Sequence, residues 1–131
     1  MGRPATGQGR TVKSVVTYRV SPAFIDLATL AIMRMSREAG EFLAFRKCAV
    51  RCVQTLAIPE NKRLEDSVHR YSATDWRGFL SVNLALTESE AALFTATREG
   101  LSERFGTPFN NLDTTVLAMF GYLALLPGSR L

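Results

Sequence analysis

The side chains best suited to metal binding or nucleophilic catalysis are two cysteines, Cys48 and Cys52, and the single histidine, His69. The cysteines are four residues apart in a helical pattern, which places them on one helix face, where a mutual disulfide is geometrically awkward. A zinc site would need a fourth ligand and the short loop spacing of zinc-binding motifs, and the sequence offers neither. A nucleophilic Cys–His pair would need a group that orients His69, and none is evident. We therefore expect reduced, buried thiols, no metal, no cofactor, and a protein that is not an enzyme.

Polar side chains recur at every second position of two short segments. Residues 80–86 read Leu-Ser-Val-Asn-Leu-Ala-Leu, and residues 14–20 read Ser-Val-Val-Thr-Tyr-Arg-Val. A period of two is typical of a β-strand with one buried face. We therefore predict strands at 13–20 and 79–86. Their outward side chains would be Val15, Thr17, Arg19, Ser81, Asn83 and Ala85.

Signals for helix starts and ends follow each predicted strand. Ser21-Pro22 and the capping box Thr87-x-x-Glu90 favour helix starts, and Gly40 and Gly106 favour helix ends. A helix from 42, with Phe42 on its apolar face, and a helix opened by Thr107-Pro108 would complete the set. The predicted segments are a flexible basic arm at 1–12, helices at 22–39, 42–57, 88–105 and 107–126, and a linker at 59–78. In this linker, Trp76 is expected to pack against the helical core.

Two strand–helix–helix segments, 13–58 and 79–127, match at an offset of 66 residues. The identical pairs at that offset are Leu27/Leu93, Thr29/Thr95, Ser36/Ser102, Gly40/Gly106 and Val50/Val116. A lone strand followed by two helices cannot satisfy its own backbone or bury its apolar stripe, whereas two such units paired antiparallel can do both. We therefore predict a mainly α-helical fold with a two-stranded antiparallel ribbon. Residues 13–127 would form one domain, an intramolecular pseudo-dimer.

The alternating strand, the capped first helix, the glycine turn and the second helix resemble the ribbon-helix-helix DNA-binding proteins of the Arc/MetJ type, here twice in one chain. The resemblance implies sequence-specific binding of double-stranded DNA, with the ribbon in the major groove and the six outward side chains as readers. The tandem arrangement is similar to single-chain accessory proteins of T-DNA and plasmid transfer systems. That similarity implies a relaxase or a partition-type ATPase as a protein partner. A transcriptional repressor of the same fold is the alternative.

The same resemblance implies phosphate contacts at the N-terminus of each second helix, where backbone N–H groups and the helix dipole favour anions. In the second unit, Thr107 would hold this position. In the first unit Glu41 stands there instead, and Arg46 and Lys47 are expected to compensate. Lys13 would add a phosphate contact that positions the protein without reading the base sequence.

The charge distribution suits a polyanion partner but does not require one. The chain of 131 residues has a formal net charge of +4, and residues 1–60 hold nine Lys/Arg against four Asp/Glu. No apolar run is long enough to span a membrane, and the first ten residues lack the apolar core of a signal peptide, so we expect a cytoplasmic protein without a membrane partner or a small-molecule substrate. Two alternatives stay open for the outward residues. They are the solvated face of a sheet, or the face around Val15 is an assembly surface for another protein.

Overall fold

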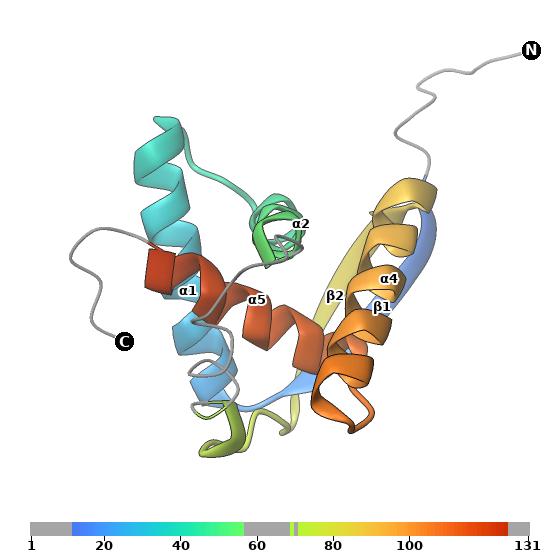
Figure 1. The fold of residues 1–131 in the computed structure, drawn as a ribbon. Coiled ribbons are helices and arrows are strands. Elements are labelled where there is room, and N and C mark those ends of the chain that lie inside the picture. The colour runs from blue at the N-terminus through green and yellow to red at the C-terminus, as the bar shows by residue number, and fades with distance from the viewer. Residues whose placement is uncertain (1–11, 57–68, 70, 126–131) are drawn as a thin grey trace, which may run out of the picture.

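The computed structural model describes residues 12–56, 69 and 71–125, which are mainly helical with a two-stranded antiparallel sheet (Figure 1). Residues 1–11 of the predicted basic arm and residues 59–68 and 70 of the predicted linker lie outside the described part of the chain. None of the described helices is both long and apolar enough to cross a membrane. The elements in chain order are β1 (Val12–Val20), α1 (Pro22–Ala39), α2 (Phe45–Leu56), β2 (Leu80–Thr87), α4 (Glu88–Phe105) and α5 (Asn111–Leu125).

The sheet has the predicted alternation except at the start of β2, where Leu80 is 46% exposed instead of buried. β1 and β2 pair antiparallel with Thr17 opposite Asn83, and the register is regular except for an irregularity between Val12 and Ser14. Tyr18, Val20, Leu84 and Leu86 are buried, at 3% exposed or less. Their neighbours in the sequence point to the other face. One face of the sheet therefore packs on the helices and the other is open.

The bounds of α1 and α4 confirm the predicted helices 22–39 and 88–105. Gly40 and Gly106 end them with φ angles of 73° and 68°, in the left-handed region that glycine adopts without strain. At the start of α4, the Thr87 side chain accepts from the Glu90 N–H and the Glu90 side chain accepts from the Thr87 N–H. Ser21 stands at the N-cap of α1 but makes no such bond. Its hydroxyl instead donates to the Asp75 carbonyl at 2.9 Å, because the end of β1 packs against the segment before β2.

The other two helices begin later than predicted. α2 begins at Phe45, so Phe42 precedes the helix and is 89% exposed instead of buried. After Gly40 the chain first turns Leu43 into the core, where its N–H donates to the Ser36 hydroxyl at 2.9 Å. This contact between elements, and not the local apolar pattern, decides where α2 starts.

The prediction that Thr107 and Pro108 open the last helix is wrong. After Gly106 the buried Phe109 donates its N–H to the Ser102 hydroxyl at 2.8 Å, which keeps this stretch out of a helix. α5 then begins at Asn111. Asn110 Oδ1 accepts from the Asp113 N–H at 2.8 Å, and Asp113 Oδ2 accepts from the Asn110 N–H at 3.0 Å. This reciprocal pair satisfies the first N–H groups as a capping box does.

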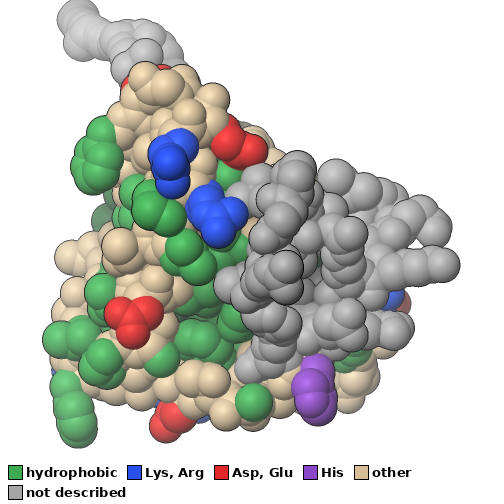
Figure 2. Space-filling view, turned by 90° about the vertical axis from the view of Figure 1, so that its left-hand side faces the viewer, with side chains coloured by type: hydrophobic (Ala, Val, Ile, Leu, Met, Phe, Trp, Pro, Cys, Tyr) green, Lys and Arg blue, Asp and Glu red, His purple; other side chains and the backbone are tan. Residues whose placement is uncertain are grey.

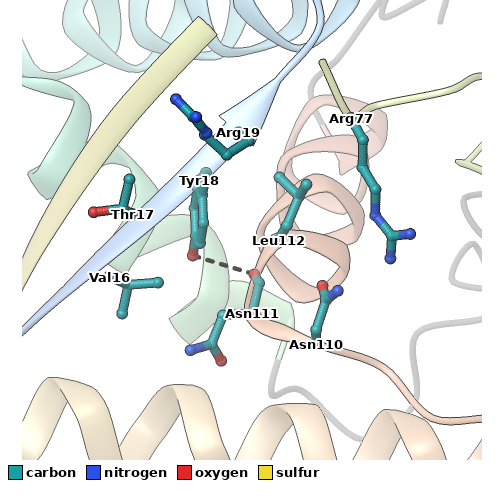
Figure 3. A pocket seen from close by; sticks show the side chains of 8 residues that line it. All are labelled: Val16, Thr17, Tyr18, Arg19, Arg77, Asn110, Asn111 and Leu112. Atoms are coloured by element: carbon teal, nitrogen blue, oxygen red, sulfur yellow. Dashed lines mark hydrogen bonds between the residues drawn. The ribbon is translucent and has the colours of Figure 1, made fainter. Parts of the chain in front are cut away.

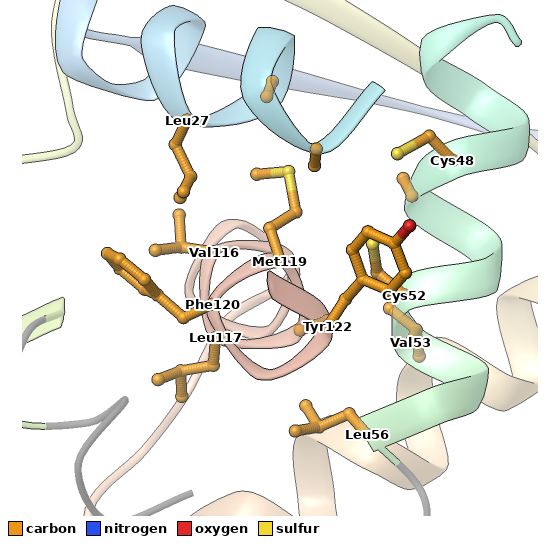
Figure 4. Packing of buried hydrophobic residues seen from close by; sticks show 14 of the residues in the cluster. Leu27, Cys48, Cys52, Val53, Leu56, Val116, Leu117, Met119, Phe120 and Tyr122 are labelled. Carbon is orange, nitrogen blue, oxygen red and sulfur yellow. The ribbon is translucent and has the colours of Figure 1, made fainter. Parts of the chain in front are cut away.

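α5 lies at the centre of the molecule, with α1 and α2 beside it (Figure 4). Every residue from Leu112 to Leu123 is buried, including Asp113, Thr114 and Thr115. A helix buried on all sides needs apolar or internally bonded side chains, and both threonine hydroxyls donate to backbone carbonyls four residues earlier. Trp76 packs edge-on against Phe120, with 5.6 Å between ring centroids, which confirms the expected contact of the linker with the core.

Candidate nucleic-acid interface

The open face of the sheet carries the six predicted outward residues as three cross-strand pairs: Val15 with Ala85, Thr17 with Asn83, and Arg19 with Ser81. We call these six residues the ribbon face. Five of them are exposed, with Val15 at 60%, and Ala85 is half-buried. None of the six is acidic. The ribbon face therefore presents a narrow polar strip with one cation and an apolar end.

Hydrogen bonds hold two of the three pairs. The Thr17 hydroxyl donates to Asn83 Oδ1 at 2.9 Å, and an Arg19 guanidinium N–H donates to the Ser81 hydroxyl at 3.4 Å. The amide NH₂ of Asn83 takes no part in its bond to Thr17 and is a donor for an outside acceptor. Most of the N–H groups of the Arg19 guanidinium are likewise donors for an outside acceptor. The ribbon face thus offers mainly hydrogen-bond donors, which match acceptor-rich partners.

A pocket of about 400 Å³ lies along the edge of β1 (Figure 3). Arg77 enters it from the segment before β2 and is held there by a backbone bridge to Val20. Asn110 and Asn111 line it from the start of α5. No acidic side chain is among the described residues that line the pocket, which are Val16, Thr17, Tyr18, Arg19, Arg77, Asn110, Asn111 and Leu112. Arg77 gives this pocket a positive charge on the side of Asn110, whereas the Arg19 guanidinium points away from the start of α5 (Figure 3).

Tyr18 lines the pocket and connects β1 to the start of α5. Its hydroxyl lies 3.2 Å from the Asn111 carbonyl oxygen (Figure 3). It also shares a 2.8 Å hydrogen bond with the Thr115 hydroxyl. Burial raises the pKa of Tyr18 to about 12, although its hydrogen bond with Thr115 works against the rise. The phenol therefore stays neutral at physiological pH, and it joins β1 to the first turn of α5.

The other residues predicted to contact phosphates lie in different environments. An Arg46 Nη donates to both carboxylate oxygens of Glu90 at 2.7 Å, so this arginine connects α2 to the start of α4. Lys47 is exposed on α2. Thr107 is exposed in the turn after α4, four residues before α5 begins. Lys13 lies in β1, and its side chain is outside the described part of the chain.

Sequence reasoning missed three residues near the ribbon face: Arg77, Phe79 and Asn110. Phe79 falls inside the predicted strand 79–86, but β2 begins at Leu80, so this residue precedes the strand in a bend that the alternation does not describe. Arg77 and Asn110 had no local signal, because the pocket is made by segments that are distant in the sequence. The predicted N-cap at Thr107 also drew attention away from Asn110.

The ribbon face differs from the side of the molecule that carries α1. Figure 2 shows that side, with hydrophobic side chains exposed between residues of both charges. Ile25 and Met33 of α1 are 37% and 41% exposed. A surface that mixes both signs of charge offers no electrostatic preference for a polyanion.

The two cysteines lie away from the ribbon face, in the helical core. Cys48 and Cys52 are free, buried and packed beside α5 (Figure 4), as the sequence predicts. The hydrogen bond between the two thiols lowers the pKa of Cys48. The same bond, together with burial, raises the pKa of Cys52. His69 is exposed. Among the described residues, no group of three or more His, Cys, Asp or Glu side chains is placed to hold a metal ion.

Comparison of the chain with protein-family models, with curated proteins and with solved structures found no match.

Proposed function

We propose that this chain is a tandem ribbon-helix-helix pseudo-dimer that binds double-stranded DNA with its ribbon face in the major groove. Equal spacing supports the tandem architecture: α1 and α4 begin 66 residues apart, and so do α2 and α5. The bonds from Leu43 to Ser36 and from Phe109 to Ser102 are also 66 residues apart. Thr17 and Asn83 have that same separation and face each other. A pseudo-two-fold axis would therefore pass between them.

The observation that carries the proposal is the ribbon face itself. It is a two-stranded surface that is open to solvent, backed by a helical core, free of carboxylates and rich in donors. The major groove of B-DNA is wide enough to admit such a ribbon. Arg19 suits the O6 and N7 acceptors of guanine, and Asn83 suits the N6 and N7 edge of adenine. The solvated-sheet alternative gives no reason for the absence of acidic residues.

The two strands would read different bases. Equivalent positions carry Val15 and Ser81, Thr17 and Asn83, and Arg19 and Ala85, which differ in every pair. A symmetric protein dimer favours a palindromic site because both halves present the same residues. We therefore expect this chain to select a site that is not a palindrome. A symmetric site recovered from random DNA would contradict this expectation.

Backbone phosphates would contact the flanks of the ribbon. The pocket at the edge of β1, with Arg77 beside the start of α5, has the charge for one phosphate. At the start of α2, Arg46 is engaged with Glu90, which leaves the exposed Lys47 as the better candidate. Lys13 and Thr107 complete the proposed phosphate contacts. These groups would position the protein and make its affinity depend on salt.

The test is binding of fluorescent duplex DNA, first selected by the wild-type protein from a random pool, at two salt concentrations. Arg19→Ala/Asn83→Ala should weaken binding to the selected duplex by about 10- to 100-fold, because each base contact contributes roughly 1–3 kcal/mol. Binding to unrelated duplex DNA at low salt should change much less. The control Arg37→Ala/Gln54→Ala removes one cation and one amide from exposed helix positions and should bind as wild type does. Absence of binding by folded wild-type protein at low salt would refute the proposal.

The cellular process in which this DNA binding takes part is inferred only from the resemblance to ribbon-helix-helix proteins. An accessory role in plasmid or T-DNA transfer predicts a selected site beside a nicking site, whereas a repressor predicts a site over a promoter. A protein–protein adaptor is the competing function, and the 60% exposure of the apolar Val15 favours it. Salt dependence separates the two classes, because an apolar protein interface does not lose affinity steeply with salt as phosphate contacts do.

A further inference from the structure

We propose that Phe79 reads the methyl group of a thymine at one end of the bound DNA site. This inference rests on the proposed DNA-binding function and extends the ribbon face by one residue. Phe79 is 98% exposed, more than any other large hydrophobic residue in the described part of the chain. It stands two positions before Ser81, in the bend that leads into β2 at the Arg19 end of the ribbon.

The backbone beneath Phe79 is held tightly. The Gly78 N–H donates to the Arg19 carbonyl at 3.3 Å, and Val20 forms a bridge with Arg77. A Cβ atom at position 78 would stand 2.6 Å from the Val20 carbonyl oxygen, so the chain passes directly against the end of β1. The exposed ring is therefore carried by a backbone segment that is already fixed, so little conformational entropy of the backbone is lost on binding.

The surroundings of Phe79 favour DNA over a protein partner. Arg77 is two positions before it, and Arg19 lies opposite the neighbouring Ser81. Both arginines also line the pocket at the edge of β1. An exposed apolar ring at the end of the ribbon that carries these cations complements a surface that is polyanionic overall but has an apolar group within it. The other fully exposed phenylalanine, Phe42 at 89%, lies between α1 and α2, outside the ribbon face.

The chemistry of the groove specifies the target. Base edges in the major groove present hydrogen-bond donors, acceptors and a single kind of apolar group, the C5-methyl of thymine. Phe79 is two residues before Ser81, so its Cα lies at most about 7 Å from that of Ser81, which corresponds to no more than roughly two base-pair steps. The contact would therefore fall at the edge of the site, on the Arg19 side. It would also distinguish this end from the other end of the ribbon, where Lys13 occupies the equivalent position.

The experiment replaces each thymine of the selected duplex, one at a time, with deoxyuridine, which lacks only the methyl group. Wild-type protein should lose about 3- to 10-fold in affinity at one thymine near an end of the site, as expected for one buried methyl contact. Phe79→Ala should bind the unmodified duplex with a similar loss and should show no further loss with deoxyuridine at that position. Phe42→Ala, the matched control, should keep both the affinity and the methyl dependence of wild type.

The outcomes separate this inference from the function on which it rests. Wild-type protein that binds the selected duplex but is insensitive to every deoxyuridine overturns the role of Phe79 and leaves DNA binding intact. The same holds if Phe79→Ala retains the full deoxyuridine effect, or if the selected site has no thymine near either end. Wild-type protein that binds no duplex overturns both proposals. Circular dichroism of Phe79→Ala checks that loss of an exposed ring leaves the fold unchanged.

Discussion

Gly78 has no room for a side chain, because the end of β1 lies against it. A Cβ atom there would meet the Val20 carbonyl oxygen at 2.6 Å and the Ser21 Cα at 2.8 Å, and both are backbone atoms that cannot move alone. A single small residue thus joins the segment carrying Arg77 to the strand carrying Arg19. The positions of Arg77 and Phe79 beside the ribbon face depend on this close approach.

We expect Gly78→Ala to lower the free energy of unfolding by about 1–3 kcal/mol, the usual cost of overpacking. Urea denaturation measures the effect. Gly100→Ala is the matched control, because Gly100 lies in α4 and no atom beyond the neighbouring helix backbone is within 4 Å of the added Cβ. That change should raise stability by roughly 0.5–1 kcal/mol through helix propensity. If Gly78→Ala were as stable as wild type, the close packing described above would be wrong.

The chemistry of the ribbon face was predictable because it depends only on strand phase. Thr17, Arg19 and Asn83 alternate with buried residues, and a period of two assigns each to its face without knowledge of the fold. The adjacent pocket was not predictable in this way. Arg77 and Asn110 line the same pocket only because the segment before β2 and the segment before α5 both lie beside β1 in the fold. No local pattern contains that information.

At the scale of elements, the helices fall into two groups, because local sequence signals set the ends of some helices and tertiary packing sets the starts of others. α1 and α4 start and end at local signals, the Ser-Pro and Thr-x-x-Glu starts and the two left-handed glycines. Such signals are legible in the sequence, and both helices have the predicted bounds. The starts of α2 and α5 depend instead on burial of Leu43 and Phe109 before the helix begins. Tertiary packing therefore overrides a proline-based start signal at Thr107-Pro108.

The cap of α5 provides a test of this boundary. Asn110→Ala should destabilise the protein by about 1 kcal/mol, because it removes the side-chain acceptor for the Asp113 N–H. Thr107→Ala should change stability by less than about 0.5 kcal/mol, since Thr107 is exposed and precedes the helix by four residues. Thermal or urea unfolding of the two variants compares them directly. The reverse order of effects would restore Thr107 as the cap.

At the scale of the whole molecule, contacts distant in sequence join the first strand to the last helix. The Tyr18 hydroxyl in β1 meets Thr115 in α5, and the Tyr122 hydroxyl of α5 donates to Glu38 of α1 at 2.5 Å. Tyr71 donates to Asp113. Burial raises the pKa of each of these tyrosines, and the Asp113 and Glu38 carboxylates add to the rise for Tyr71 and Tyr122. The central helix is therefore held by neutral phenols.

These contacts predict that stability falls at alkaline pH. An unfolded tyrosine ionises near pH 10, whereas the pKa of Tyr18 in the folded protein is about 12. The folded state therefore retains a proton that the unfolded state loses. Stability from Tyr18 is complete below pH 10 and is lost as the pH rises toward 12. Tyr18 alone should lower the free energy of unfolding by about 1 kcal/mol between pH 9 and pH 11, measured by urea denaturation at the two values.

Two variants separate this ionisation from the hydrogen bond. Tyr18→Phe should be less stable than wild type at pH 9, because the hydroxyl bonds are lost, yet its stability should fall less between pH 9 and pH 11. Thr115→Val removes the bond between the two hydroxyls and keeps the phenol, and because that bond lowers the pKa of Tyr18, the variant should be less stable at pH 9 and should lose at least as much stability as wild type between pH 9 and pH 11. The remaining decline in Tyr18→Phe would come from Tyr71 and Tyr122. Equal pH dependence in Tyr18→Phe and wild type would show that Tyr18 ionises as readily in the folded chain as in the unfolded chain, and that the junction of β1 with α5 is open to water.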